Sequence, residues 1–307
     1  MVRYISGRVA QAVLVVCAVA AIIFFVMRLA PGDPARLIAG QLASADAVAA
    51  LRHQLGLDQS VMVQFGHFIA NMVRGDFGNS YYEQSSVFQL IAERLPLTLL
   101  LTAVAILVAV AIGFPLGFVA ATRRGSLVDR AVLVVQMVFQ SAPSFWLALE
   151  FLLIFGVKLA WVQPIGYEGV QSIVLPALAL AVSLIAIISR VSRASMIEIL
   201  ELDWTKALRA RGIPPRRIIW VHAFKNTWVP TLTLLGAQVG YLLGGAVVVE
   251  WIFNYPGLGL LTLNAVLRKD YPLVQAIVVV TAAIFVLVNL LIDLAYGLID
   301  PRIRIRK

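Results

Sequence analysis

The amino-acid sequence predicts an all-α polytopic membrane protein with six transmembrane helices. Hydrophobic residues make up 61% of the 307 residues, charged residues only 13%, and the mean hydropathy is +0.91. A soluble domain carries about twice that share of charged residues. Apolar runs of about 20 residues, the length that crosses a bilayer, recur along the chain. The basic residues behind the formal net charge of +9 fall between these runs and form no single patch, so they indicate membrane orientation and not a nucleic-acid partner.

Each apolar run is expected to form one transmembrane helix. The six predicted spans cover residues 9–27, 97–121, 131–157, 173–188, 229–249 and 273–292. The first is 19 residues without a charge, and Arg28-Leu29-Ala30-Pro31 is not a small-residue cleavage site, so we interpret it as a retained helix and not a signal peptide. We therefore divide the chain into an N-terminal segment with the first span (1–30), an extracytoplasmic helical loop (31–96) and a five-helix core (97–307).

The distribution of basic residues predicts the orientation. Seventeen of the 25 Lys and Arg residues lie on the side of the two termini, and eight lie on the other side. Because loops rich in Lys and Arg stay in the cytoplasm, we expect both termini to be cytoplasmic.

The loop at 31–96 is too long and too patterned for a simple tether. Ser44 can cap a helix that continues to about Leu55, and apolar residues between Val61 and Met72 recur at helical spacing. A turn at 75–78 and a short helix at 85–94 are expected to follow. Two interpretations stay open: these helices cap the bundle at the membrane surface, or they form a platform for an extracytoplasmic partner.

A polar insert at 189–228 carries eight of the basic residues between two apolar spans. A helical run from Asp203 ends at Gly212, since glycine adopts the left-handed conformation that closes helices. Pro214-Pro215 then prevents continuation and starts a second short helix, expected from 216 to about 224. An ordinary cytosolic loop would obey the same charge rule. A built helical hairpin favours a contact surface for a cytosolic partner.

Small residues mark candidate helix contacts within the spans. They are Gly113 with Gly117 in the second span, and Gly236, Gly240 and Gly244 in the fifth. Such spacing lets two helix backbones approach closely. The contact can lie within this subunit or against a partner subunit.

Three residues of the third span are candidates for a translocation pathway. Glu150 is a carboxylate within the membrane, which is costly unless it faces water or a partner. It either lines an aqueous route or is neutral in a packed interface. Ser141 and Pro143 lie mid-span, where the proline frees backbone carbonyls and permits a bend.

Signatures of enzymes and resident cofactors are missing from the sequence. It contains no phosphate-binding Gly-x-x-x-x-Gly-Lys-[Ser/Thr] loop and no Gly-x-Ser-x-Gly motif. The three histidines share no ligand spacing, and Cys17 is the one cysteine. We therefore expect no catalytic residue, no cofactor and no metal in this chain.

An ordered series of short motifs resembles the membrane-spanning permeases of ABC-type dipeptide/oligopeptide importers. The motifs are Phe25-Val-Met-Arg-Leu-Ala-Pro-Gly-Asp-Pro34, Leu55-Gly-Leu-Asp58, Gly75-Asp-Phe-Gly78, Arg94-Leu-Pro96, Arg124-Gly-Ser126, Asp129-Arg130, Ser141-Ala-Pro143, Gly257-Leu-Gly259, Asp270-Tyr-Pro272 and Asp300-Pro-Arg302. Each is short, but their order along essentially the whole chain is specific.

The resemblance implies that 189–228 is the coupling loop of a type I importer, with Gly212 as the glycine of its pattern. Lys206 and Leu208 depart from the general Glu-Ala-Ala pattern, and Ala207 is retained. The implied ATPase-coupling residues are Asp203, Lys206, Ala207, Arg209, Ala210, Arg211, Gly212, His222 and Asn226.

The resemblance also implies partners and a compartment. They are a second homologous permease subunit, one or two P-loop ATPases that bind ATP and Mg, a solute-binding protein and a peptide substrate, at the inner membrane of a prokaryote. Nickel or glutathione import on the same scaffold stays an alternative. From other classes, a gradient-driven carrier and a membrane receptor or scaffold stay open.

Overall fold

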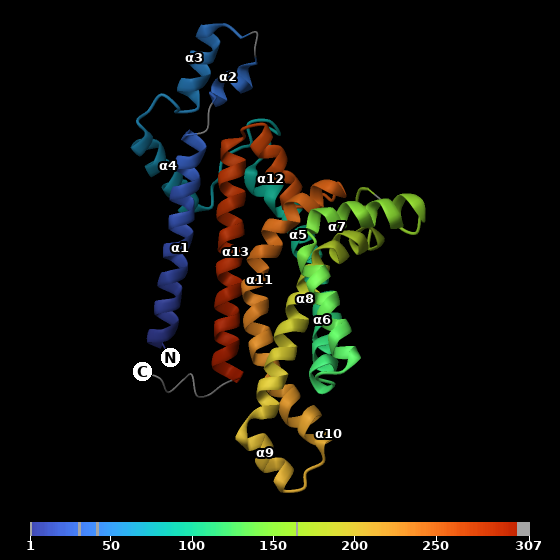
Figure 1. The fold of residues 1–307 in the computed structure, drawn as a ribbon. Coiled ribbons are helices and arrows are strands. Elements are labelled where there is room, and N and C mark those ends of the chain that lie inside the picture. The colour runs from blue at the N-terminus through green and yellow to red at the C-terminus, as the bar shows by residue number, and fades with distance from the viewer. Residues whose placement is uncertain (1, 30–31, 41–42, 164, 300–307) are drawn as a thin grey trace. The chain divides into compact units, whose positions relative to one another are not determined.

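The computed structural model describes residues 2–29, 32–40, 43–163 and 165–299, and its regular elements are helices (Figure 1). One antiparallel bridge joins Asn79 and Ser86. The elements in chain order are α1 (Val2–Leu29), α2 (Pro34–Ala39), α3 (Ala45–Gln54), α4 (Val61–Arg74), α5 (Val87–Thr122), α6 (Leu127–Ser141), α7 (Ser144–Phe151), the π-helical η1 (Leu152–Lys158), α8 (Gln171–Glu201), α9 (Asp203–Ala210), α10 (Pro215–Arg217), the π-helical η2 (Ile218–Ala223), α11 (Phe224–Ile252), α12 (Leu258–Leu267) and α13 (Tyr271–Ile299).

Four helical segments are long and apolar enough to cross a membrane. They are Ser6–Leu29, Val87–Thr122, Gln171–Glu201 and Tyr271–Ile292. Two further pairs qualify if each bent pair is one span, namely Leu127–Ser141 with Ser144–Lys158, and Pro215–Gly244 with Ala246–Ile252. The described part of the chain thus offers up to six spans, the number predicted from the apolar runs.

The predicted third span is not a straight helix. Its two halves meet at an angle of 96° between α6 and α7. The backbone is extended at Ala142 (ψ 121°), and Pro143 has no N–H to continue the helix ladder. The proline was expected to permit a bend. The observed bend turns the chain by about a right angle.

One predicted helix boundary was wrong, and one predicted span is part of a longer helix. The short helix expected at 85–94 is the beginning of α5, which continues through Pro96 into the second span. The fourth span was expected to end at 188, but α8 continues to Glu201, so much of the polar insert is helical from its start.

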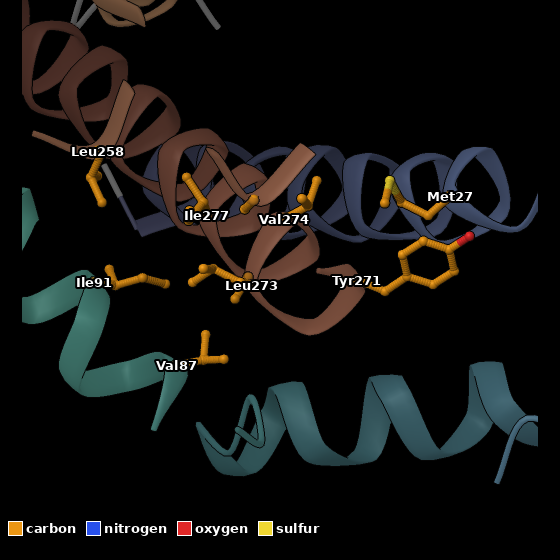
Figure 2. Packing of buried hydrophobic residues seen from close by; sticks show 10 residues of the cluster. Met27, Val87, Ile91, Leu258, Tyr271, Leu273, Val274 and Ile277 are labelled. Atoms are coloured by element: carbon orange, nitrogen blue, oxygen red, sulfur yellow. The ribbon is translucent and has the colours of Figure 1, made fainter. Parts of the chain in front are cut away.

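The chain divides into two compact units, residues 1–97 with 257–290 and residues 98–256 with 291–307. The core of the first unit joins the end of α1, the beginning of α5, α12 and α13. Figure 2 shows Val87 and Ile91 of α5 beside Leu273 of α13, with Met27 of α1 next to Tyr271. A buried hydrogen bond from the Ser80 hydroxyl to the Asp270 carboxylate, 2.5 Å long, fixes the loop before α5 in the same unit.

In the second unit α8 is the central element, packed against α6, α7 and α11. Eighteen of its residues are buried, from Ser172 to Ile199. The helical hairpin of α9 and α10 follows at its C-terminal end (Figure 1). The hairpin is thus continuous with α8 at its beginning and with α11 at its end.

Candidate functional site

The hairpin of residues 203–223, called the coupling hairpin below after the role expected from the sequence, is fixed to the second unit at its base. Thr205 is the one fully buried residue of α9, and its hydroxyl donates to the Ile199 carbonyl of α8 at 2.8 Å. Only Leu202 separates α8 from α9, and it is extended (ψ 148°). The hairpin is thus a direct continuation of α8 and not a tether.

The turn of the hairpin depends on Gly212. The backbone there has φ +75°, in the left-handed region that favours glycine. The Gly212 N–H donates to the Arg209 carbonyl at 3.0 Å, and the Ile213 N–H donates to the Leu208 carbonyl at 3.2 Å. These bonds satisfy carbonyls at the end of α9 in the manner of a glycine C-cap. Pro215 then occupies the first turn of α10, where its missing N–H costs nothing.

The second half of the hairpin differs from the prediction. No separate helix ends near 224, because the chain passes from α10 through the π-helical segment η2 directly into α11. Ile218 and Ala223 are buried against the unit (1% and 0% exposed). Aromatic rings of α5 pack on this junction: the rings of Phe114 and Trp228 stack at 4.3 Å, and Phe118 lies 4.6 Å from Trp220. The junction is therefore held by apolar packing.

The predicted coupling residues of α9 and its turn are all exposed. They are Asp203, Lys206, Ala207, Arg209, Ala210, Arg211 and Gly212. Lys206 pairs with Asp203 at 2.9 Å along the helix surface. Arg209 and Arg211 have no ion-pair partner within the described residues. The hairpin thus presents a cationic surface.

His222 and Asn226 lie apart from that surface, at the junction of η2 and α11. The Asn226 side-chain amide donates to the His222 carbonyl at 2.8 Å. His222 is half-buried and Asn226 exposed. The Asn226 side chain thus bonds to the backbone of the junction, beside the buried Ala223.

The candidate pathway residues do not form one site. Ser141 and Pro143 line an open groove of about 630 Å³ at the α6–α7 bend, together with Met137 and Trp146. The Ser141 hydroxyl donates to the Met137 carbonyl at 2.8 Å. Glu150 lies on α7, half-buried, and does not line this groove.

The glycines of the predicted contacts have different surroundings. A Cβ at Gly113 would lie 2.8 Å from the Ile185 carbonyl oxygen, and one at Gly117 only 2.2 Å from the Ser189 carbonyl oxygen. These two glycines therefore let α5 and α8 approach closely. A Cβ at Gly244 would meet nothing within 4 Å. In the same helix, α11, Gly236 is buried and Gly240 half-buried.

Two buried charged groups in the second unit are missing from the sequence-based set of candidates. Asp129, at the beginning of α6, accepts hydrogen bonds from Arg193 of α8 at 2.6 and 2.9 Å, and its side chain is 4% exposed. The available clues were the Ser126-x-x-Asp129 spacing, a helix-start signal, and the Asp129-Arg130 motif of the family resemblance. Glu250 is fully buried near the end of α11 and accepts from the Thr98 hydroxyl at 2.6 Å. It follows directly on the predicted fifth span, so it resembled a flanking charge.

Comparison with known proteins agrees with this architecture. Residues 113–305 match the family "Binding-protein-dependent transport system inner membrane component", and residues 1–102 match the N-terminal family of such membrane components. A probable peptide ABC transporter permease protein of Sinorhizobium fredii is 38% identical over 309 residues, which cover 98% of this chain and 99% of that protein. The glutathione transport system permease protein GsiC of Escherichia coli K12 is 37% identical over 304 residues, covering 99% of each chain.

A solved structure shares the fold. A chain of the inward-facing MetNI methionine ABC transporter superposes with a TM-score of 0.60 at 19% identity, covering 69% of this chain and 97% of that one. At this identity the likeness concerns the fold alone. The family matches span nearly the whole sequence, and they confirm the resemblance carried by the short motifs. The chain therefore belongs to the binding-protein-dependent transport system inner membrane components and is a permease subunit of an ABC importer.

Proposed function

We propose that this chain forms, with a second homologous permease subunit, the translocation pathway for di- or oligopeptides. A solute-binding protein delivers the peptide on the side of the 31–96 loop. One or two cytosolic P-loop ATPases bind ATP and Mg and drive the cycle, and this chain itself performs no catalysis. Both termini face the cytoplasm of a prokaryotic cell, in agreement with the basic residues on their side.

The coupling hairpin is the observation that supports this mechanism most directly. Its exposed cationic surface, with Arg209 and Arg211, suits an acidic cleft of an ATPase subunit. Its base is fixed to α8 through Thr205 and to α5 through the aromatic junction. A hairpin held in this way moves as one body with α8. Nucleotide binding can shift the membrane spans only if the ATPase contacts differ between its states, and a rigid attachment transmits that difference.

The names of the relatives support a peptide substrate. One relative is called a probable peptide permease, and several others are called glutathione transport system permeases. Glutathione is itself a tripeptide, so both names are compatible with a passage for short peptides. Glutathione is the second candidate, favoured by the 38% identity to a Salmonella GsiC over 99% of both chains.

Copurification tests the assembly. The tagged chain is purified from its native membrane in a mild detergent, and mass spectrometry identifies what accompanies it. We expect a homologous six-span protein and one or two P-loop ATPases. Recovery of this chain alone, or only with copies of itself, would contradict the ATP-driven mechanism and favour gradient-driven transport.

Uptake tests the substrate. The purified complex is reconstituted with its binding protein, and ATP-dependent uptake of dipeptides, longer peptides and glutathione is compared. We expect peptides of at least one length to be taken up. Uptake of glutathione without any competition by peptides would favour the second candidate.

A further inference from the structure

A polar pocket of about 310 Å³ lies at the end of α1 that leads into the 31–96 loop. Its wall combines side chains from five places in the chain, which are Arg28 of α1, Asp33, Arg52 of α3, Gln64 of α4 and Tyr271 of α13. All of them belong to the first compact unit. Three motifs that carry the family resemblance, at 25–34, 55–58 and 270–272, contribute to this wall. The coupling mechanism uses none of them.

Arg28 is held in place by its neighbours. Its guanidinium carbon lies 3.4 Å from the centre of the Phe24 ring. Its Nε and Nη2 atoms donate to the Gln64 Oε1 atom at 3.1 and 2.8 Å, and Nη1 donates to the Phe24 carbonyl at 3.3 Å. A guanidinium has five N–H groups, and the three hydrogen bonds above use three of them. The other two have no acceptor among the described residues. Arg28 is thus a preorganised cation with donors available for a ligand.

The charges around the pocket favour an anion. Arg52 pairs with Asp33 at 2.5 Å, and the second Asp33 oxygen accepts from the Ala35 N–H at 3.1 Å. Arg28 has no ion-pair partner among the described residues. Two arginines and one carboxylate therefore line the pocket.

The position of α4 indicates where such an anion comes from. Phe65 and Phe68 of α4 pack on Phe24, with ring centres 5.1 and 5.5 Å apart. Other apolar side chains of the same helix are left exposed, including Met62 (69%) and Val73 (79%). Because an amphipathic helix with such a surface binds at the membrane interface, we expect α4 to lie at the headgroup level of the bilayer. Basic side chains at that level recognise lipid phosphates.

We propose that this pocket binds the phosphate of an anionic phospholipid headgroup through Arg28 and Arg52. Free phosphate carries the same chemistry, but the apolar surface of α4 beside the pocket gives acyl chains a place that a free anion does not need. The bound lipid joins α1, α3 and α4 at one point and stabilises the 31–96 loop against the membrane surface. This inference does not depend on which solute the importer carries.

Lipid titration tests the proposal. The full-length chain, purified with its accompanying subunits and delipidated by detergent exchange, is titrated with dihexanoyl phosphatidylglycerol and followed by native mass spectrometry. We expect the first lipid molecule to bind more tightly than further molecules of the same lipid. The double variant Arg28→Gln with Arg52→Gln should weaken the affinity for this first molecule at least about tenfold, the effect of losing a charged hydrogen bond. Arg74→Gln, a matched loss of an exposed cation at the end of α4 and outside the pocket, should leave the affinity unchanged.

Two further ligands show separately what the phosphate and the acyl chains contribute to the affinity. Dihexanoylglycerol, which lacks the phosphate, should bind at least about tenfold more weakly, and equal binding would overturn the proposal. Glycerol 1-phosphate, which lacks the acyl chains, should also bind more weakly. Equal affinity for it would overturn the lipid assignment in favour of a free anion. If the double variant does not assemble, Arg52→Gln alone gives the same test, because α3 has no buried residue. An unchanged affinity in that variant would contradict the proposal.

Discussion

Arg193 of α8 holds Asp129 of α6 in a two-point ion pair. The Nε and Nη2 atoms of the arginine lie 2.6 and 2.9 Å from the two carboxylate oxygens, and the side chains are only 20% and 4% exposed. The Gly125 N–H also donates to this carboxylate, at 2.9 Å. Arg193 lies eight residues before the end of α8, and the coupling hairpin begins just after that end. It therefore connects the α5–α6 turn to the helix that carries the hairpin.

Breaking this ion pair is expected to destabilise the second unit. Asp129→Asn or Arg193→Gln leaves one buried charge without its partner, at a cost of about 3–5 kcal/mol. The double variant should lose less than the sum of the two single variants, because the remaining groups are both neutral. Thermal unfolding of the detergent-purified complex measures all three. Additive losses would show that the two side chains do not act as a pair.

A neighbouring exposed ion pair supplies the control. Arg124 contacts Glu201 at 2.5 Å and links the same turn to the same helix, but both side chains are more than half exposed (60% and 64%). Exposed pairs contribute about 0–1 kcal/mol. Arg124→Gln should therefore leave the unfolding temperature nearly unchanged. A loss as large as that of Arg193→Gln would mean that burial does not distinguish the two pairs.

Gly117→Ala is expected to force α5 and α8 apart. The added Cβ would lie 2.1 Å from the Ser192 hydroxyl oxygen and 2.2 Å from the Ser189 carbonyl oxygen, and the second is backbone that cannot rotate away. Overpacking of this kind costs about 1–3 kcal/mol or more. We expect a lower unfolding temperature of the purified chain and a smaller yield of the complex.

Gly244→Ala separates packing within this chain from contact with a partner subunit. Nothing lies within 4 Å of the added Cβ, and alanine favours a helix by about 1 kcal/mol over glycine. The isolated chain should be as stable as the wild type or slightly more so. Copurification of the second permease subunit should decrease if that face of α11 packs against it. Unchanged recovery of that subunit would exclude Gly244 from the interface.

Thr205→Val is expected to loosen the hairpin from α8. The substitution keeps the shape of the side chain but leaves the Ile199 carbonyl without the hydroxyl donor that lies 2.8 Å away. Loss of a buried hydrogen bond costs about 1 kcal/mol. Peptide uptake per ATP hydrolysed should decrease, and Thr205→Ser should restore it because the hydroxyl returns. Equal uptake by the valine and serine variants would contradict a role for this bond.

The sequence was sufficient for the elements that depend on local signals. The apolar runs predicted the six spans, and Ser44 caps α3 by accepting from the Ala47 N–H at 3.2 Å, as its position predicted. The turn at Gly212 also follows from a local conformational preference. Each of these features is determined by a few neighbouring residues.

Features that depend on distant partners were not predictable in the same way. Pro96 suggested a helix boundary, but α5 continues through it. Arg193 looked like one more cation of a cytosolic loop, because its partner Asp129 is 64 residues away. The helix and turn of the hairpin were located from the sequence, whereas the attachment of the hairpin to α8 required the structure. Tertiary packing decided these cases over local preference.

Gly212→Val is expected to uncouple ATP hydrolysis from uptake without preventing assembly. A β-branched residue at φ +75° is strained by about 1–2 kcal/mol, while the space around Gly212 is open, so the effect acts on the turn and not through a clash within the chain. Asn tolerates this backbone conformation, so Gly212→Asn is the matched control and should retain uptake. ATP hydrolysis and peptide uptake are measured together in proteoliposomes. Normal uptake by the valine variant would show that the geometry of this turn does not transmit the movement of the ATPase.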